Sequence, residues 1–218
     1  MNQAAAVVLD LDGVIVKSNL VKHHAMLSLF SAPAAELEKI SAYILANGGV
    51  RRDHKITHVL GKILGIEPTG AVVADYLSRY AEKLESLLSV APLVEGVKEF
   101  LAVGAHTFYV SSSAPEIEVE AQLARANLAG SFAKVYGAGT PKASALHQIV
   151  SFEPDRAVIF FGDSVGDLEA AKEANVAFVA VACELDNFPG QCVIKVSSFA
   201  SLASVEQAIQ GAIALHAI

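Results

Sequence analysis

The chain has 218 residues and a net charge of −7, and 53% of its residues are apolar, which excludes a disordered chain. The acidic surplus argues against a nucleic-acid partner, and no apolar run approaches the ~18 residues that cross a bilayer. Strand-like sequence begins at Ala5, which leaves no room for a signal peptide, and two cysteines are too few for a disulfide scaffold. We therefore expect a cytoplasmic globular protein, a monomer or homodimer, with no nucleic-acid or membrane partner.

Short β-branched runs alternate with longer helical periods over most of the chain. Strands are predicted at 6–9, 107–110, 134–136, 157–161, 178–181 and 192–196. Helices are predicted at 94–103, 115–128, 142–150, 166–175 and 201–215. This alternation is typical of a parallel sheet flanked by helices, so we expect an α/β fold with a Rossmann-like sheet.

One region breaks the alternation. Residues 17–91 carry helical periodicity throughout, with helices predicted at 20–30, 34–46, 52–64 and 71–88. The stretch is too long for a single crossover between strands, so it predicts a helical domain of residues 17–91 inserted into a core of 1–16 and 92–218. Residues 14–92 hold nine basic and seven acidic side chains, whereas the remainder holds seven basic and sixteen acidic ones.

Acidic residues follow two of the predicted strands. Asp10 and Asp12 come after 6–9, and Asp163 and Asp167 come after 157–161. The carboxyl ends of parallel strands form the ligand-binding edge of such a sheet, so these acids are expected to meet there. Two carboxylates ~4 Å apart repel by about 4 kcal/mol at an effective dielectric near 20, which favours a bound cation, and Mg²⁺ prefers oxygen ligands. The alternatives are an Asp-Gly turn at Asp12 and a favourable first-turn position for Asp167.

A hydroxyl and an ammonium are predicted at the same edge. Ser111 directly follows the strand 107–110 and could donate to a phosphoryl oxygen. For Ser112 and Ser113 a helix cap is the simpler interpretation. Lys142 stands in the first turn of a predicted helix, where the helix dipole disfavours a cation. A facing carboxylate or phosphate would explain that position, and a solvated surface lysine is the alternative.

In this order, the segments resemble the motifs of the haloacid-dehalogenase-like superfamily, in its helically capped phosphatase and phosphomutase branch. Asp10-Leu11-Asp12-Gly13 is similar to the first motif, Ser111 to the second, Lys142 to the third, and the run 162–167 to the fourth. The predicted helical insert lies where that family places its cap domain. The resemblance extends over nearly the whole chain.

The resemblance implies a role for each residue. Asp10 would be the nucleophile that forms an aspartyl-phosphate, and Asp12 the group that protonates the leaving alcohol and then deprotonates water. Mg²⁺ would be held by Asp10, Asp12 (through its backbone carbonyl), Asp163 and Asp167. The transferring phosphoryl group would be bound by Ser111, Ser112 and Lys142. Family members that cleave carbon–halogen bonds lack a carboxylate two residues after the nucleophile, so Asp12 favours phosphoryl transfer.

The insert carries one further similarity. The run 48–52, Gly-Gly-Val-Arg-Arg, resembles the Gly-Val-x-Arg specificity loop of helical caps, which implies that Arg52 contacts the non-reacting end of the substrate. Arg51 stands where serine is commoner, and Lys17 where an aspartate is usual, so the roles of both are open.

The predicted function is a Mg²⁺-dependent phosphatase that hydrolyses a small phosphorylated metabolite with an acidic or sugar-like body. One alternative is a phosphomutase of the β-phosphoglucomutase type, in which the phosphoryl group passes from Asp10 to another hydroxyl. A more distant alternative is a non-enzymatic, receiver-like signalling module. Such a module would carry adjacent acids after its first strand, whereas here Leu11 separates Asp10 from Asp12.

Overall fold

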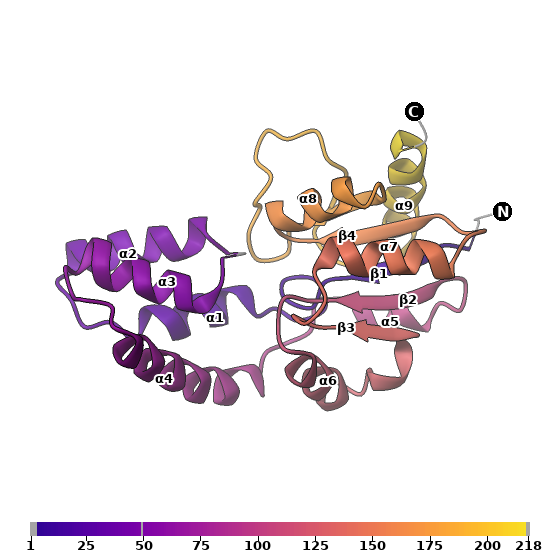
Figure 1. Ribbon diagram of the computed structural model, residues 1–218. Coiled ribbons are helices and arrows are strands. Elements are labelled where there is room, and N and C mark those ends of the chain that lie inside the picture. The colour runs from indigo at the N-terminus through magenta and orange to yellow at the C-terminus, as the bar shows by residue number, and fades with distance from the viewer. Residues whose placement is uncertain (1–3, 49, 217–218) are drawn as a thin grey trace. The chain divides into compact units, whose positions relative to one another are not determined.

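The computed structural model describes residues 4–48 and 50–216, which form two compact units (Figure 1). The core unit comprises Met1–Lys17 and Pro92–Ile218, and the inserted unit comprises Ser18–Ala91.

The core unit is built on a six-stranded sheet in the order β3-β2-β1-β4-β5-β6. Its strands are β1 (Ala6–Leu9), β2 (Thr107–Ser111), β3 (Lys134–Tyr136), β4 (Val158–Gly162), β5 (Ala177–Val181) and β6 (Lys195–Val196). Every neighbouring pair is parallel, with Val8 of β1 opposite Tyr109 of β2 and Phe160 of β4. The predicted α/β fold with a Rossmann-like parallel sheet is therefore confirmed.

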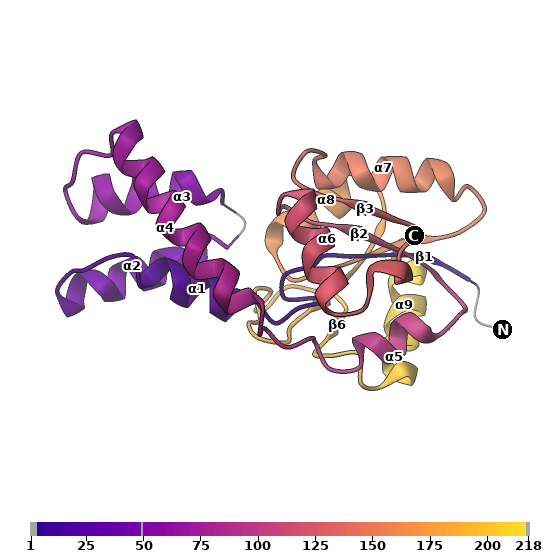
Figure 2. The same ribbon diagram turned by 90° about the horizontal axis from the view of Figure 1, so that it is seen from below.

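Helices cover both faces of this sheet, as Figure 2 shows. They are α5 (Val97–Ala102), α6 (Glu116–Arg125), α7 (Lys142–Phe152), α8 (Val165–Glu173) and α9 (Leu202–His216). Helices α7 and α8 lie on one face, and α5 and α9 on the other. Under α7 and α8 the buried side chains include Val8, Leu146, Ile149 and Phe160. The other face holds a cluster of aromatic rings from Phe100, Phe108, Phe161 and Phe199.

Strand β1 lies at the centre of the sheet, and its burial follows from its sequence. All four residues of Ala6–Leu9 are apolar and fully buried, because helices pack on both faces. The chain passes from β1 to β2 and β3 on one side and later to β4, β5 and β6 on the other. The carboxyl ends of β1 and β4 therefore stand at the point where the strand order reverses, which is where open α/β sheets bind ligands.

The inserted unit is helical and has its own apolar core. It comprises α1 (Asn19–Leu27), α2 (Ala34–Ala46), α3 (Arg52–His58), a π-helical turn η1 (Val59–Ile63) and α4 (Gly70–Leu88). Ile40, Ile56, Leu60 and Tyr80 are among its buried side chains. The helix predicted at 52–64 thus ends in the π-helical turn. Among the described residues, no helix combines the length and hydropathy that a membrane span requires.

Some predicted boundaries in the core unit were too generous, and two of them have a clear physical cause. The helix predicted at 94–103 begins only at Val97, because Gly96 adopts a left-handed conformation with φ of 77° that ends the preceding turn. The strand predicted at 192–196 shortens to Lys195–Val196, since the amide of Val193 donates to the nearby carbonyl of Gln191 instead of to β5.

Candidate active site

The first acidic loop follows β1. Asp10 is 5% exposed, and its carboxylate accepts a 2.7 Å hydrogen bond from the amide of Leu11. The chain then turns tightly, with the amide of Gly13 donating to the carbonyl of Val16 at 2.8 Å. Gly13 has a φ of 75°, a conformation that favours glycine, and half-buried Asp12 precedes it in this turn. The Asp-Gly turn is therefore present, and it directly follows the buried carboxylate of Asp10.

The second acidic loop follows β4 and leads into α8. Asp163 is 8% exposed and Asp167 only 1%. Ser164 and Asp167 form a capping box: the amide of Asp167 donates to the Ser164 hydroxyl at 3.3 Å, and the amide of Ser164 donates to Asp167 Oδ2 at 3.1 Å. A Cβ atom on Gly162 would lie 2.4 Å from the Cβ atom of Asp167, so only glycine lets this loop pack so closely.

The two loops bring three carboxylates together. Oxygen atoms of Asp10, Asp163 and Asp167 all lie within 4.8 Å of one another, and all three residues are buried. Sequence reasoning placed these acids at one sheet edge, and they meet there. Among the described residues, the carboxylate of Asp12 is not part of this group. The contact predicted for Asp12 runs through its backbone carbonyl and stays a prediction.

Lys142 lies between two of these acids. Its ammonium is 2.9 Å from Asp10 Oδ2 and also donates to Asp167 Oδ1, and its side chain is 13% exposed. Burial alone would lower the pKa of Lys142, but the charges of Asp10 and Asp167 outweigh it and raise that pKa above its usual range. These contacts explain a lysine in the first turn of α7 against the helix dipole. The alternative of a solvated surface lysine is wrong.

The electrostatics of Asp10 indicate that the site lacks positive charge. Burial raises the pKa of Asp10 to about 7; Lys142 opposes this rise, while the neighbouring Asp167 and Asp12 add to it. The ammonium of Lys142 alone therefore does not fully stabilise the ionised carboxylates of this cluster. Additional positive charge at the site would stabilise them further.

The two serines at the end of β2 differ in their contacts. Ser111 is fully buried, and its hydroxyl oxygen has no hydrogen-bond partner among the described residues. Buried polar groups are nearly always hydrogen-bonded, so an unpartnered hydroxyl at a sheet edge indicates a place for a ligand. The Ser112 hydroxyl instead accepts a 3.1 Å hydrogen bond from the amide of Ala114, which lies before α6. The helix cap predicted for Ser112 and Ser113 is wrong, because α6 begins after Pro115 and no side chain caps it. The contact of Ser112 with substrate stays a prediction.

In the inserted unit, the two neighbouring arginines have different partners. Arg51 forms two hydrogen bonds with Asp53, of 3.1 and 3.0 Å. Arg52 begins α3, and its guanidinium carbon lies 5.5 Å from the centre of the Tyr80 ring. Gly49 of the predicted specificity loop lies outside the described residues. The substrate contact predicted for Arg52 stays a prediction.

Sequence reasoning missed two side chains that contact the acidic loops. The thiol of Cys183 donates to the carbonyl of Gly13 at 3.0 Å, and the amide of Asn187 donates to the carbonyl of Asp163 at 2.8 Å. Both residues lie in the connection from β5 to β6, which carries no recognisable motif. The sequence signal that could have pointed to Cys183 and Asn187 is their place after β5, since this connection also leaves the carboxyl edge of the sheet.

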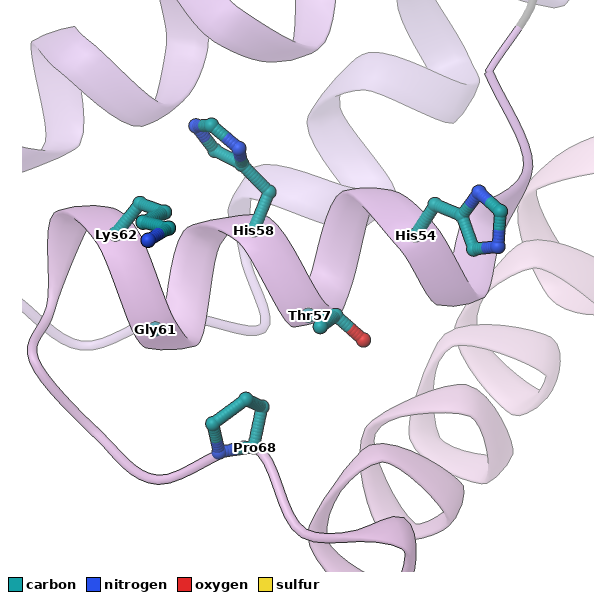
Figure 3. Close-up of a pocket in the computed structure, with 6 residues that line it drawn as sticks. All are labelled: His54, Thr57, His58, Gly61, Lys62 and Pro68. Carbon is teal, nitrogen blue, oxygen red and sulfur yellow. The ribbon is translucent and has the colours of Figure 1, made fainter.

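A cavity of about 410 Å³ lies within the inserted unit, separate from all of these residues. It is lined by His54, Thr57, His58, Gly61, Lys62 and Pro68 (Figure 3). None of the predicted site residues lines it. The ring of His58 stacks on Tyr43 with the ring centres 4.0 Å apart, so it already has a packing role.

A model of one protein family matches most of the chain. The haloacid dehalogenase-like hydrolase family matches residues 7–181. That range includes both acidic loops, Ser111, Lys142 and the whole inserted unit. No curated protein matches the chain.

Solved structures share the fold at low sequence identity. A haloacid dehalogenase-like protein of unknown function from Agrobacterium tumefaciens str. C58 is 19% identical, with a TM-score of 0.74 over 95% of this chain and 99% of that one. A predicted phosphoglycolate phosphatase from Haemophilus somnus 129pt is 18% identical, with a TM-score of 0.73 over 94% and 99%. A candidate β-phosphoglucomutase from Thermotoga maritima is 17% identical, with a TM-score of 0.70 over 94% and 99%. At these identities the likeness shows the fold.

Proposed function

Because the chain belongs to the haloacid dehalogenase-like hydrolase family, we propose that it is a Mg²⁺-dependent phosphatase that hydrolyses a small phosphorylated metabolite. The observation that carries the proposal is the meeting of three buried carboxylates and one ammonium at the carboxyl edge of the sheet. Membership of a hydrolase family, with a helical insert after β1, argues against the receiver-like alternative.

The donor set fits Mg²⁺. Carboxylate oxygens of Asp10, Asp163 and Asp167 lie within 4.8 Å of one another, and an all-oxygen site suits a hard cation. The raised pKa of Asp10 supports the same assignment, since burial and its acidic neighbours leave that carboxylate short of positive charge. When bound, Mg²⁺ would supply charge that offsets the repulsion between these carboxylates and an anionic phosphoryl group.

Asp10 is the proposed nucleophile. A carboxylate oxygen of Asp10 attacks phosphorus and forms an aspartyl-phosphate, while the bond from phosphorus to the alcohol oxygen breaks. Lys142, 2.9 Å from Asp10, holds the attacking carboxylate in place and carries positive charge to the reaction centre. The unpartnered Ser111 hydroxyl is suited to donate a hydrogen bond to a phosphoryl oxygen, and Ser112 would add to that contact.

Asp12 is the proposed acid and base. It gives a proton to the departing alkoxide in the first step, and the resulting carboxylate then takes a proton from the water that attacks the aspartyl-phosphate. Phosphate is released and Asp10 is restored. Its place in the turn directly after the nucleophile supports the role, because the half-buried side chain of Asp12 keeps access to solvent.

The inserted unit is the proposed cap. Arg52 would grip a carboxylate, phosphate or sugar hydroxyl at the far end of the substrate, and its planar guanidinium suits bidentate contacts. Arg51 forms two hydrogen bonds with Asp53, whereas Arg52 begins α3 and its guanidinium lies over the Tyr80 ring. A substrate with an acidic or sugar-like body follows from this assignment.

The test is phosphate release from a panel of phosphorylated metabolites, with Mg²⁺ and with EDTA. We expect release that requires Mg²⁺ and that falls by at least ~10⁴-fold in Asp10→Asn, because the nucleophile is lost. Asp155→Asn is the matched control: Asp155 is an exposed acid at the opposite end of β4, and its variant keeps full activity. Isomerisation of a phosphosugar without phosphate release would instead support the phosphomutase. Inactivity on every panel member, or an active Asp10→Asn variant, would contradict the phosphatase.

A further inference from the structure

One connection in the core unit reaches both acidic loops. Residues 182–194 join β5 to β6, and within them Asn187 Nδ2 donates to the carbonyl of Asp163 at 2.8 Å. The thiol of Cys183 donates to the carbonyl of Gly13, in the turn after Asp12, at 3.0 Å. The connection therefore contacts the main chain of both loops that carry the proposed metal ligands.

Asn187 is held between two anchored neighbours. Asp186 accepts a 2.9 Å hydrogen bond from the amide of Phe188, and the ammonium of Lys195 contacts both Asp186, at 2.8 Å, and the carbonyl of Phe188, at 2.7 Å. The ring of Phe188 is fully buried in a cluster with Leu168 of α8. The main chain on either side of Asn187 is thus fixed from β6 and from α8, which leaves its amide directed at Asp163.

The peptide group that Asn187 contacts is held at both ends. Its carbonyl, that of Asp163, accepts from Asn187, and its N–H group, that of Ser164, donates to Asp167 Oδ2 at 3.1 Å. A peptide group is planar and moves as one body. Rotation of this group would therefore move the Asp163 side chain and disturb the carboxylate of Asp167 at the same time.

We infer that Asn187 is a positioning residue of the metal site: through the Asp163–Ser164 peptide it holds Asp163 and Asp167 in the arrangement that binds a divalent cation. The inference rests on the proposed Mg²⁺ site and adds to it a residue that touches neither the cation nor the substrate. Residues that orient metal ligands in this way typically contribute about 10- to 100-fold to metal affinity.

The test is Mg²⁺ binding, measured by titration calorimetry on the full chain without substrate. Asn187→Leu nearly keeps the side-chain volume and removes the donor, and we expect its Kd for Mg²⁺ to rise about 10- to 100-fold. The melting temperature of Asn187→Leu in EDTA should stay close to that of the wild type. If Asn187 had a merely structural role, the melting temperature of the variant would be lower. Asn187→Gln retains an amide donor and should lose less affinity than Asn187→Leu.

Gln191→Leu is the matched control, because Gln191 is exposed in the same connection and should leave the Kd unchanged. A Kd for Asn187→Leu within twofold of the wild type would overturn the inference, as would an equal loss in Gln191→Leu. If Asn187→Leu does not fold, Asn187→Ser is judged by the same twofold limit. Absence of Mg²⁺ binding by the wild type contradicts the proposed metal site itself, an outcome distinct from an unaffected variant.

Discussion

Two buried lysines, one in each unit, have opposite surroundings. In the core unit, Lys142 lies between Asp10 and Asp167, whose charges raise its pKa despite burial. In the inserted unit, Lys55 is 8% exposed and its ammonium donates to the carbonyl of Gly48 at 2.9 Å. Burial, together with the nearby charges of Lys22 and Arg52, lowers the pKa of Lys55 to about 8.

The difference separates two kinds of site. At Lys142 the opposite charges are already in place, so the ammonium stabilises a cluster of carboxylates that the fold has built. At Lys55 the charges that shift the pKa, those of Lys22 and Arg52, have the same sign as the ammonium, so burial and repulsion both lower that pKa. In the proposed function, the core unit holds the reaction centre and the inserted unit recognises the substrate.

The largest effect in this comparison is expected from Lys142→Met. The variant removes the positive charge beside the nucleophile, so kcat should fall by about 10²- to 10⁴-fold. It also leaves Asp10 and Asp167 without their ammonium, which should lower the free energy of unfolding by about 3–5 kcal/mol. Steady-state kinetics and urea unfolding measure the two quantities. A variant that keeps wild-type kcat would show that Lys142 has a structural role only.

A smaller effect is expected from Arg52→Ala. If Arg52 grips the non-reacting end of the substrate, its loss should raise KM by about 10- to 100-fold and change kcat much less, because that contact is present before and during the reaction. Arg51→Ala is the control, since Arg51 is already paired with Asp53, and its KM should change less than threefold, roughly the worth of a surface ion pair. Equal KM values for Arg52→Ala and the wild type would contradict the role of Arg52.

The smallest effect is on stability and concerns Lys55. The unfolded chain keeps Lys55 protonated up to its usual pKa of 10.5, whereas the folded chain releases that proton near pH 8. Unfolding therefore takes up a proton between these values, so this group makes stability rise with pH there. Lys55→Met removes the cost of the buried charge and, after loss of the hydrogen bond to Gly48, should stabilise the protein by about 2 kcal/mol at pH 7.

Urea unfolding of Lys55→Met and the wild type at pH 7 and pH 10 tests this expectation. The gain in the variant should be largest at pH 7 and should shrink at pH 10, where the folded wild type no longer carries the charge. A gain that is equal at both pH values would show that the charge of Lys55 is not the cause. Lys62→Met, in the same unit but at an exposed position, is the matched control and should change the free energy of unfolding by less than about 0.5 kcal/mol.

The features that could be predicted from the sequence are those that follow from repeated or local rules. The continuous apolar run of β1 identified a central strand, and the rule that parallel strands end at one edge brought Asp10 and Asp163 together. The unfavourable position of Lys142 at the start of a helix indicated a facing carboxylate or phosphate. Each of these predictions requires only the identity of neighbouring residues and the class of the fold.

Other features depend on contacts between segments far apart in sequence. Asn187 lies 24 residues from Asp163, in a connection without a motif, and only the fold brings its amide to that carbonyl. The pairing of Arg51 with Asp53 is local, but it was not predicted, because residues two apart do not face each other on a helix. Many glycines can adopt the left-handed conformation that Gly96 has at the start of α5, and here the main chain of Phe199 and Ala200 packs directly against it.

The central claim is that the acids that follow β1 and β4 bind one divalent cation. It is tested most directly by anomalous diffraction from a crystal soaked in Mn²⁺, which substitutes for Mg²⁺ in oxygen-ligand sites. The account predicts one strong peak within coordination distance of carboxylate oxygens of both Asp10 and Asp163, and its loss in an Asp163→Ala crystal. A peak elsewhere, or none at this edge of the sheet, would contradict it.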